Sequence, residues 1–392
     1  MWRSVASNAL TLFIVILIGL AVLVAWGRNE FVKPGPLTEP ICLQVERGAS
    51  LSSVSRILEE RGAVTDARIF RIGAEYADRA GDLKFGSYML PESASMAEVL
   101  EAVTAGGRST CGRAVNFRIG IARSDVVLSE LDLATNSFVE VVKFDAGAET
   151  VPQEYQDVAE DADLRFRITV AEGVTSWQVV DALKKAEFLT GALDAVPSEG
   201  SLAPDSYEIE RGTERGAIVA EMIRRQDVRL AEAWAARAEG LPYATPEEAL
   251  IMASIVEKET AVPDERRQVA SVFVNRLKKG MRLQTDPTVI YGITRGEGVL
   301  GRGLRQSELR RETPWNTYVI DGLPPTPIAN PGLEAIRAAL DPDSTDYIFF
   351  VADGTGGHAF AVTLEEHNKN VARWRAIEAE QGTEGETGVQ GE

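Results

Sequence analysis

The chain has 392 residues, of which 45% are hydrophobic and 26% are charged. This composition is typical of a globular protein rather than a disordered one, and the length allows two or three domains with cores of their own. A formal net charge of −18 argues against nucleic acid as a partner, because binding to phosphates depends on Lys and Arg.

An apolar segment opens the chain, with no charged residue between Arg3 and Arg28. At about 1.5 Å per residue, a helix of this length covers roughly 36 Å, which exceeds a bilayer core of about 30 Å. Trp2 and Trp26 lie near its ends, as in an aromatic belt. A cleaved signal peptide is the alternative, but the run is long for one and no A-x-A site follows. We therefore predict a transmembrane anchor at 1–28 and, because three prolines follow, a linker at 29–40.

The sequence from 44 to 58 is echoed at 169 to 183, at an offset of about 125 residues. Each copy predicts a strand, a Gly turn, a Ser or Thr helix cap and an amphipathic helix. A second echo pairs 85–103 with 199–223 at a different spacing. Two such βα units are consistent with a LysM-like glycan-binding module at 41–107. The same pattern is also a common αβ building block.

Two cysteines, Cys42 and Cys111, flank this module. In an oxidising compartment they could close a loop of roughly 70 residues, which is worth about 4 kcal/mol. Two unpaired buried thiols are the alternative. A zinc site is not expected, since two Cys and two His lack ligand spacing. We expect no metal and no cofactor.

Between the two units, residues 108–165 are interpreted as a strand-rich insertion. Apolar and polar residues alternate at 114–122 and 138–144 and near 124–131, which predicts short strands. At the other end of the chain, residues 376–392 are acidic, rich in Gly and without periodicity. We predict that this tail is disordered.

Residues 245–260 predict a helix with a strong start signal. Thr245 is a good N-cap, Pro246 fits the first helical position, and Glu248 can close a capping box. Apolar residues lie on both flanks between 249 and 256, so the helix is expected to be enclosed on most sides.

Glu257 ends this apolar run and is expected to project toward Leu250, Ala253 and Ser254. Burial would favour the neutral carboxyl and raise its pKa, which is what a general acid needs near neutral pH. A Glu paired with Lys258 on a solvated helix end is the alternative. Glu259 is not excluded as the acid.

Three longer runs follow in a fixed order, at 272–292, 312–336 and 346–368. With ASIVEKET at 253–260 and EGSLAPDSYEI at 199–209, they resemble the catalytic region of the endolytic murein transglycosylases, the MltG (YceG-like) family; the likeness reaches 43–107 more loosely. The resemblance implies an α+β protein with an N-terminal transmembrane helix, a LysM-like βα subdomain and a catalytic domain at 166–375. Thr326 and Trp315 depart from the family's usual Gly and Tyr, which affects substrate contacts rather than the reaction.

By resemblance, Glu257 corresponds to the catalytic glutamate. The resemblance also implies substrate contacts from polar residues of the same motifs: Asn275, Gln284, Asp286, Asn316 and Tyr318. From the residues alone, Asp286 reads either as a second acid or as an Asp-Pro turn residue. His358 follows a Gly-rich turn, where a lone His is more often structural. The turn lacks the Lys and the spacing of a phosphate-binding loop.

The activity implied is endolytic cleavage of the bond between N-acetylmuramic acid and N-acetylglucosamine in nascent peptidoglycan. It leaves 1,6-anhydro ends and terminates strand elongation, so the protein would be a lyase of cell-wall biogenesis and degradation. The implied partners are glycan strands, the inner membrane and peptidoglycan synthases (penicillin-binding proteins). Positive charges at the two ends of the anchor nearly balance, so only the resemblance places the C-terminal body in the periplasm. The alternatives are a hydrolase using Glu257 and Asp286, and a non-catalytic glycan-binding scaffold.

Overall fold

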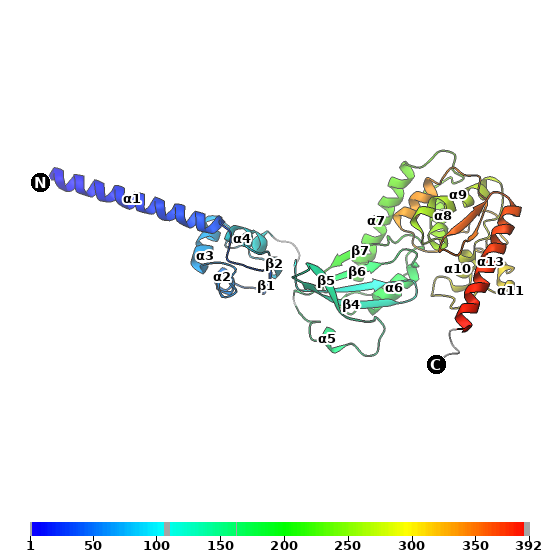
Figure 1. Cartoon of the computed structure of the whole chain (residues 1–392), viewed down its shortest axis with the longest axis horizontal. Helices are drawn as coiled ribbons and strands as arrows, with labels where there is room; N and C mark the ends of the chain where they lie inside the picture. Colours follow the sequence, from blue (N-terminus) through cyan, green and yellow to red (C-terminus); the bar gives the residue numbers. More distant parts are fainter. Residues whose placement is uncertain (1, 106–109, 162, 388–392) are drawn as a thin grey trace. The chain divides into compact units, whose positions relative to one another are not determined.

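The computed structural model describes residues 2–105, 110–161 and 163–387 (Figure 1). The chain forms two compact units. Unit 1 comprises Met1–Asn116, Val127–Phe144 and Glu149–Phe166, and unit 2 comprises Phe117–Val126, Asp145–Ala148 and Arg167–Glu392. The chain contains both helices and strands, and the strands of the two two-stranded sheets pair antiparallel. The predicted α+β class is confirmed.

Unit 1 begins with a long helix, α1 (Trp2–Val32), whose segment Leu10–Val32 is long and apolar enough to cross a membrane. The helix therefore continues four residues into the segment predicted as a linker. Its end is set by Pro34, because a proline disfavours helical geometry in the residue before it. The rest of the segment is not a free linker either. Leu37 is buried in the core of the module, and Gly35 N–H donates to the Ser93 carbonyl at 3.0 Å.

The module that follows consists of β1 (Ile41–Val45), α2 (Leu51–Glu60), α3 (Ala67–Tyr76), β2 (Gly86–Leu90) and α4 (Met96–Thr104). The two strands pair antiparallel, with Ile41 opposite Leu90 and Val45 opposite Gly86. Side chains of Ser50, Asp66 and Ser95 cap the three helices. The helices and strands share one apolar core. The LysM-like identity of the module stays a prediction.

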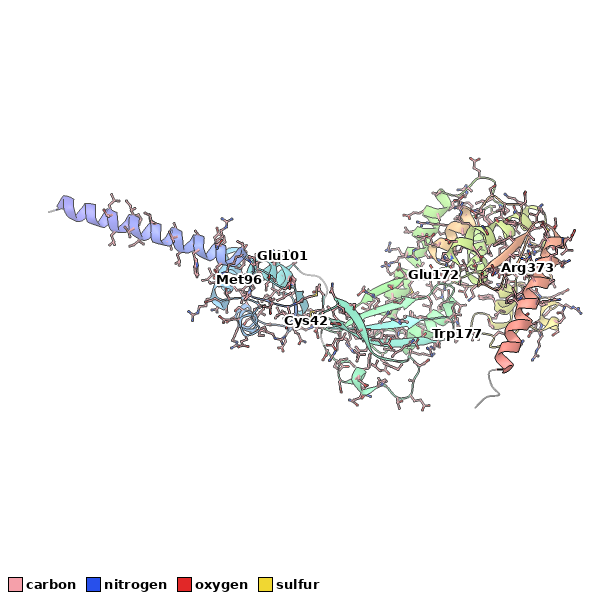
Figure 2. The ribbon with its side chains drawn as sticks, in the orientation of Figure 1. Cys42, Met96, Glu101, Glu172, Trp177 and Arg373 are labelled. Atoms are coloured by element: carbon pink, nitrogen blue, oxygen red, sulfur yellow. A yellow bond between two sulfur atoms is a disulfide. The ribbon has the colours of Figure 1, made fainter. Side chains whose placement is uncertain are left out.

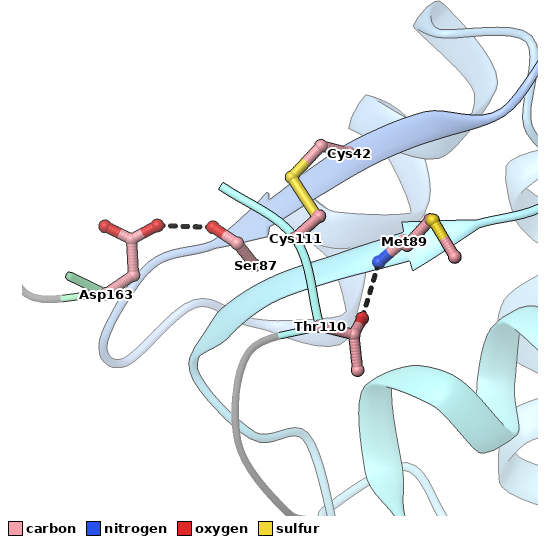
Figure 3. The surroundings of a disulfide bond; sticks show 6 residues. All are labelled: Cys42, Ser87, Met89, Thr110, Cys111 and Asp163. Atoms are coloured by element: carbon pink, nitrogen blue, oxygen red, sulfur yellow. Dashed lines mark hydrogen bonds between the residues drawn. A yellow bond between two sulfur atoms is a disulfide. The ribbon is translucent and has the colours of Figure 1, made fainter. Parts of the chain in front are cut away.

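A disulfide joins Cys42 in β1 to Cys111, with their Cα atoms 5.8 Å apart (Figure 3). Of the two alternatives left open by the sequence, the structure has the bridge. Two hydrogen bonds lie beside it. Met89 N–H donates to the Thr110 hydroxyl at 2.8 Å, and the Ser87 hydroxyl donates to the Asp163 carboxylate. The segment that leaves the module is thus tied to it by the bridge and the Thr110 hydrogen bond, and the segment before β6 is tied to it through Asp163.

A five-stranded sheet has the order β5-β4-β3-β6-β7, and a short helix, α5 (Gln153–Gln156), precedes β6. Its strands are β3 (Arg113–Ile119), β4 (Ser124–Asp132), β5 (Ser137–Asp145), β6 (Arg165–Val170) and β7 (Ser206–Ile209). The predicted strands at 114–122, 124–131 and 138–144 are confirmed. Their interpretation as an insertion stays a prediction; β3 pairs directly with β6, so the segment belongs to the same sheet as the second βα unit. The predicted boundary at 107/108 lies outside the described residues.

The sequence echo is a structural repeat. After β6, Gly173 has the same positive φ of 77° as Gly48 after β1. Thr175 caps α6 (Ser176–Lys185) through a capping box, in the position that Ser50 holds before α2. A left-handed residue costs a glycine little, so both copies can turn sharply from strand to helix. The second echo is also structural, since β7 is followed by α7 (Arg215–Ala235) as β2 is followed by α4.

The rest of unit 2 is mainly helical. Its elements are α8 (Pro246–Glu259), η1 (Pro263–Glu265), α9 (Arg266–Lys278), α10 (Asp286–Thr294), α11 (Gln306–Leu309), α12 (Leu333–Leu340), β8 (Phe349–Ala352), β9 (His358–Ala361) and α13 (Leu364–Thr387). Helix α8 packs against α7, α9, α10 and α12. Every residue from Ala249 to Val256 is buried, which confirms that this helix is enclosed.

Helix α13 lies beside β8 and β9 and continues through Thr387 (red in Figure 1). The prediction of a disordered tail is therefore wrong for residues 376–387, and residues 388–392 lie outside the described residues. Ala, Glu and Gln are good helix formers, so the run AIEAEQ from 376 to 381 extends the helix readily. Ile377 packs against Gly354 of the β8–β9 turn.

Candidate active site

The last turn of α8 carries three ionisable residues in a row, Glu257, Lys258 and Glu259. The start of the helix is as predicted, with the Thr245 hydroxyl accepting from Glu248 N–H at 3.3 Å and Pro246 in the first turn. The Glu248 carboxylate accepts from Ala244 N–H at 2.6 Å rather than from the cap residue. Since the helix is fixed at its start and buried along its middle, the directions of its last side chains are fixed too.

Glu257 points toward the start of α12. Its carboxylate accepts a hydrogen bond from Gly332 N–H at 3.0 Å, and Gly332 is the N-cap residue of that helix. Burial raises the pKa of Glu257, as predicted, while the Gly332 hydrogen bond opposes the rise and the Glu172 carboxylate adds to it. An anion at a helix N-terminus is a common structural arrangement. Lys258 does not pair with Glu257 alone, because its Nζ donates to the Gly173 carbonyl at 3.2 Å.

Glu172, labelled in Figure 2, is a neighbour of Glu257 that the sequence analysis missed. It lies in the turn after β6, and Arg266 approaches it at 3.6 Å. A Cβ atom on Gly332 would overlap the Glu172 carboxylate, so only glycine fits there without movement. The repeat could have flagged this residue, since Glu172 stands where the first copy has Arg47, a reversal of charge in an otherwise similar turn.

Glu259 points the other way, toward the loop that precedes α10. The Thr285 hydroxyl donates to its carboxylate. Burial raises the pKa of Glu259, the Thr285 hydrogen bond opposes that rise, and the Asp286 carboxylate adds to it. With Thr260 and Ala261, Glu259 lines a cavity of about 300 Å³ whose other walls are Ala352, Gly354, Gly356, Gly357, His358 and Trp374. This buried carboxyl therefore has an open space beside it.

Three of the five predicted substrate contacts lie on the Glu259 side. Asp286 accepts a hydrogen bond from the Tyr318 hydroxyl at 2.7 Å. Gln284 has a positive φ of 52°, and its side-chain oxygen accepts from Arg276 at 3.4 Å. Gln284 and Asp286 are exposed and Tyr318 is half-buried, so a ligand could reach all three. Asp286 begins α10, which agrees with its reading as an Asp-Pro residue at a turn into a helix.

The other two predicted contacts, Asn275 and Asn316, brace loops. The Asn275 amide donates to the carbonyls of Thr345 and Tyr347 at 2.8 and 3.0 Å. Asn316 is fully buried, and its amide nitrogen donates to three carbonyl oxygens, the nearest being that of Arg311 at 2.7 Å. Asn316 has no exposed surface in this conformation, and its assignment as a substrate contact stays a prediction.

The two departures from the family pattern are linked. Trp315 Nε1–H donates to the Thr326 hydroxyl at 2.9 Å, and Thr326 in turn donates to the Pro327 carbonyl at the same distance. A glycine at 326 would have no hydroxyl to receive this bond. The two departures from the family pattern are therefore coupled, because each residue supplies one partner of the same hydrogen bond. Among the described residues no group of three or more His, Cys, Asp and Glu could hold a metal ion.

A buried carboxyl that lines a cavity at the end of an enclosed helix is an arrangement suited to general acid–base chemistry, here in an α+β protein with a candidate membrane span. The chain belongs to the YceG-like family, whose model matches residues 43–137 and 147–373. That match includes most of the segment 108–165, which the sequence analysis interpreted as an insertion. The unmatched residues 138–146 coincide with most of strand β5.

Proteins named endolytic murein transglycosylase are similar to this chain. One from Streptococcus pneumoniae serotype 2 (strain D39) is 29% identical over 345 residues, covering 85% of this chain and 58% of its own. One from Bacillus subtilis (strain 168) is 27% identical over 355 residues, covering 90% of each. The chain thus spans little more than half of the streptococcal relative. A crystal structure of a putative YceG-like protein from Listeria monocytogenes is 26% identical with a TM-score of 0.43, covering 84% of this chain and 99% of that one.

Proposed function

We propose that this protein is an endolytic murein transglycosylase. It cleaves the bond between N-acetylmuramic acid and N-acetylglucosamine within nascent glycan strands, forms 1,6-anhydro-muramic acid ends and so terminates strand elongation. The proposal is supported by membership of the YceG-like family and by the names of relatives that align with most of the chain. A single buried carboxyl that opens on a cavity supplies what the chemistry needs.

Two carboxyls of α8 compete for the role of the acid, and Glu259 is the better candidate. The observation that carries this choice is the cavity, because Glu259 lines it and has Asp286 and Tyr318 nearby. The Glu257 carboxylate instead accepts a hydrogen bond from the N-terminus of α12. The sequence-based prediction of Glu257 is thereby moved by two residues along the same motif, and Glu257 remains the alternative that the experiment tests.

One residue can both donate and accept the proton that the reaction moves. Protonated Glu259 gives its proton to the glycosidic oxygen as the bond from that oxygen to C1 of the muramic acid breaks. The resulting carboxylate then takes the proton of the muramyl C6 hydroxyl as its oxygen bonds to C1. No water is consumed, so the second carboxylate that a hydrolase needs is dispensable. Burial favours the protonated carboxyl, which is the form that starts the cycle.

Gln284, Asp286 and Tyr318 are assigned to the glycan, because they are accessible and lie on the Glu259 side of α8. An amide, a carboxylate and a phenol can hydrogen-bond sugar hydroxyls and acetamides. Asn275 and Asn316 shape the surrounding loops rather than bind the substrate directly.

The protein is anchored in the inner membrane by α1 with its body in the periplasm. Helix α1 fits a single-pass anchor, and a disulfide is characteristic of an oxidising compartment such as the periplasm. Its partners in this setting are glycan strands and the peptidoglycan synthases that make them.

The test is mass spectrometry of glycan strands digested by the wild type, Glu259→Gln and Glu257→Gln. The wild type should leave anhydro-muramic ends, and Glu259→Gln should lower the rate by about 10²–10⁴ or more, because it removes the acid and the base together. Glu257→Gln should keep most of the activity. The reverse ranking would return the role to Glu257. Reducing ends, together with an Asp286→Asn variant as damaged as Glu259→Gln, would indicate a hydrolase. Binding without any cleavage by the wild type would indicate a scaffold.

A further inference from the structure

Glu265 and His358 form a close pair at the edge of the cavity. One carboxylate oxygen of Glu265 accepts from His358 backbone N–H at 2.8 Å, and the other lies 2.7 Å from the ring Nδ1. Both side chains are 17% exposed. The preceding Gly357 has no room for a Cβ, which would approach a Glu265 carboxylate oxygen to 2.5 Å. Two hydrogen bonds to one carboxylate fix both the turn and the ring.

This pairing determines which ring nitrogen of the neutral imidazole carries the proton. An ionised carboxylate can only accept hydrogen bonds, so Nδ1 is the donor and Nε2 keeps a lone pair. Within the described part of the chain, no hydrogen bond to His358 Nε2 is present. The ring packs edge-on against Phe350, with the centroids 5.2 Å apart, which limits its rotation. A fixed acceptor without a protein partner is what a ligand site offers.

The same cavity holds the rest of a sugar-binding set. Glu259, His358 and Trp374 all line it. His358 is close enough that its positive charge, when present, would lower the pKa of Glu259. An indole ring provides an apolar face for a pyranose ring, and the imidazole provides an acceptor for its polar edge. The glycines at 354, 356 and 357 leave the wall between them free of side chains.

We propose that His358 is a substrate-binding residue of this site, with Nε2 accepting a hydrogen bond from a hydroxyl or acetamide N–H of the amino sugar. Glu265 is then a positioning residue, because it acts on the substrate only through the tautomer and orientation of His358. The inference rests on the proposed function and deepens it, since it gives the sugar a contact that the family motifs did not supply. The rival role is purely structural, with His358 serving only to clamp the β8–β9 turn to Glu265.

Two substitutions of His358 separate these roles. In His358→Asn the amide nitrogen stands near Nδ1 and can still donate to Glu265, but nothing occupies the place of Nε2. In His358→Gln the amide oxygen stands near Nε2 and can still accept from the sugar, but the bond to Glu265 is lost. If His358 contacts the sugar, His358→Gln should bind glycan strands more tightly than His358→Asn. If His358 only holds the β8–β9 turn to Glu265, His358→Asn should bind more tightly than His358→Gln.

The measurement is the affinity of full-length protein for purified uncross-linked glycan strands, made in the Glu259→Gln background so that no strand is cut. His358→Asn should weaken binding about five- to tenfold, as for one uncharged hydrogen bond, and His358→Gln should stay within about twofold. In the active protein, His358→Asn should raise KM by a similar factor. Thermal melting of each variant checks the fold.

The inference is overturned if His358→Asn binds as well as its parent, or if both variants weaken binding equally with unchanged melting.

Glu265→Gln gives a second check. Its amide can donate to Nδ1, which moves the imidazole proton to Nε2 and turns the acceptor into a donor, so binding should weaken while the turn stays folded. Wild-type cleavage is scored separately. Intact cleavage with an unaffected His358→Asn removes this inference alone, whereas a wild type that cuts no strand removes the proposed function.

Discussion

Glu257 and Glu259 leave helix α8 on opposite sides, one bound to Gly332 N–H and the other to the Thr285 hydroxyl. Two residues correspond to about 200° around a helix axis, so carboxyls only two positions apart face different surroundings. One stabilises the start of α12, and the other faces a cavity. The position of the acid within the EKE motif is therefore decided by what packs around the helix.

The first prediction is that Glu259→Gln stabilises the protein at neutral pH. Because burial raises the pKa of Glu259 in the folded state, the folded protein binds a proton more tightly than the unfolded chain does. That contribution to stability is complete below the unfolded pKa and is lost as pH rises through the folded pKa. Gln carries no charge to bury, so its melting temperature should exceed that of the wild type at pH 7 and match it at about pH 4.

Glu247→Gln is the matched control, since Glu247 is exposed in the first turn of the same helix. It should change the melting temperature little at either pH. A Glu259→Gln variant with the same melting temperature as the wild type at both pH values would mean that the buried carboxyl carries no penalty. The activity of the wild type should fall on the alkaline side, as pH passes the raised pKa and the protonated acid disappears.

Local signals in the sequence were enough for much of the fold. Three such signals could be recognised, because each of them involves only residues that are close together in the sequence. They are the helix cap at Thr245, the repeated turn around Gly48 and Gly173, and the alternation of apolar and polar residues in β3 to β5. The pairing of β3 with β6 could not, because it depends on contacts across more than 40 residues. The sequence therefore could not show that the strand-rich segment shares a sheet with the second βα unit.

The site was predicted at the level of the motif and not of the side chain. The motif predicted the burial of the carboxyl and the direction of its pKa shift, and the structure has both. It could not show that Asn316 is turned inward to three carbonyls, because a polar residue in a turn-rich segment is equally compatible with either direction. Glu172 and Glu265 were missed since their partners Gly332 and His358 are far away in sequence.

A second prediction concerns the close approach at Gly332. Gly332→Ala should destabilise the protein by less than about 1 kcal/mol, because the new methyl group displaces the exposed Glu172 carboxylate, which can turn away at the expense of its ion pair with Arg266. The φ of Gly332 is −71°, so the backbone itself tolerates alanine. Removing the obstacle with Glu172→Ala should restore most of the loss in the double variant, as measured by urea unfolding. Additive losses in the two single variants would show that the overlap is not the cause.

A third prediction separates a bracing residue from a binding residue. Asn316→Ala removes an amide that donates to three part-buried carbonyls and should cost about 1–3 kcal/mol of stability. Tyr318→Phe removes only the bond to Asp286 and should cost about 1 kcal/mol. Well below the melting temperature, the affinity for glycan strands should fall more in Tyr318→Phe than in Asn316→Ala. A larger loss of affinity in Asn316→Ala would return that residue to the substrate contacts.

A fourth prediction is that α1 holds the protein in the membrane. Its span Leu10–Val32 is apolar and unburied in the structure, so washing membranes with high salt or alkaline carbonate should not release the chain. Arg28 and Lys33 should not matter to this retention, because salt removes only charge-based attachment. Release of an intact chain by carbonate, or recovery of a soluble form beginning near residue 27, would contradict the anchor.

The last prediction is that the Cys42–Cys111 bridge stabilises unit 1 alone. The two residues are 69 positions apart, and closing a loop of this size should contribute about 4 kcal/mol by restricting the unfolded chain. Hydrogen exchange followed by mass spectrometry can localise the effect. After reduction, or in a Cys42→Ser/Cys111→Ser variant, amides of β1 and β2 should exchange up to about a thousandfold faster, where they open by unfolding of the module. Peptides covering α8 and α9 serve as the internal control and should keep their protection. Equal acceleration in both sets would mean that the bridge supports the whole chain, and no acceleration in either would mean that the core around Leu43 and Leu58 holds the module without it.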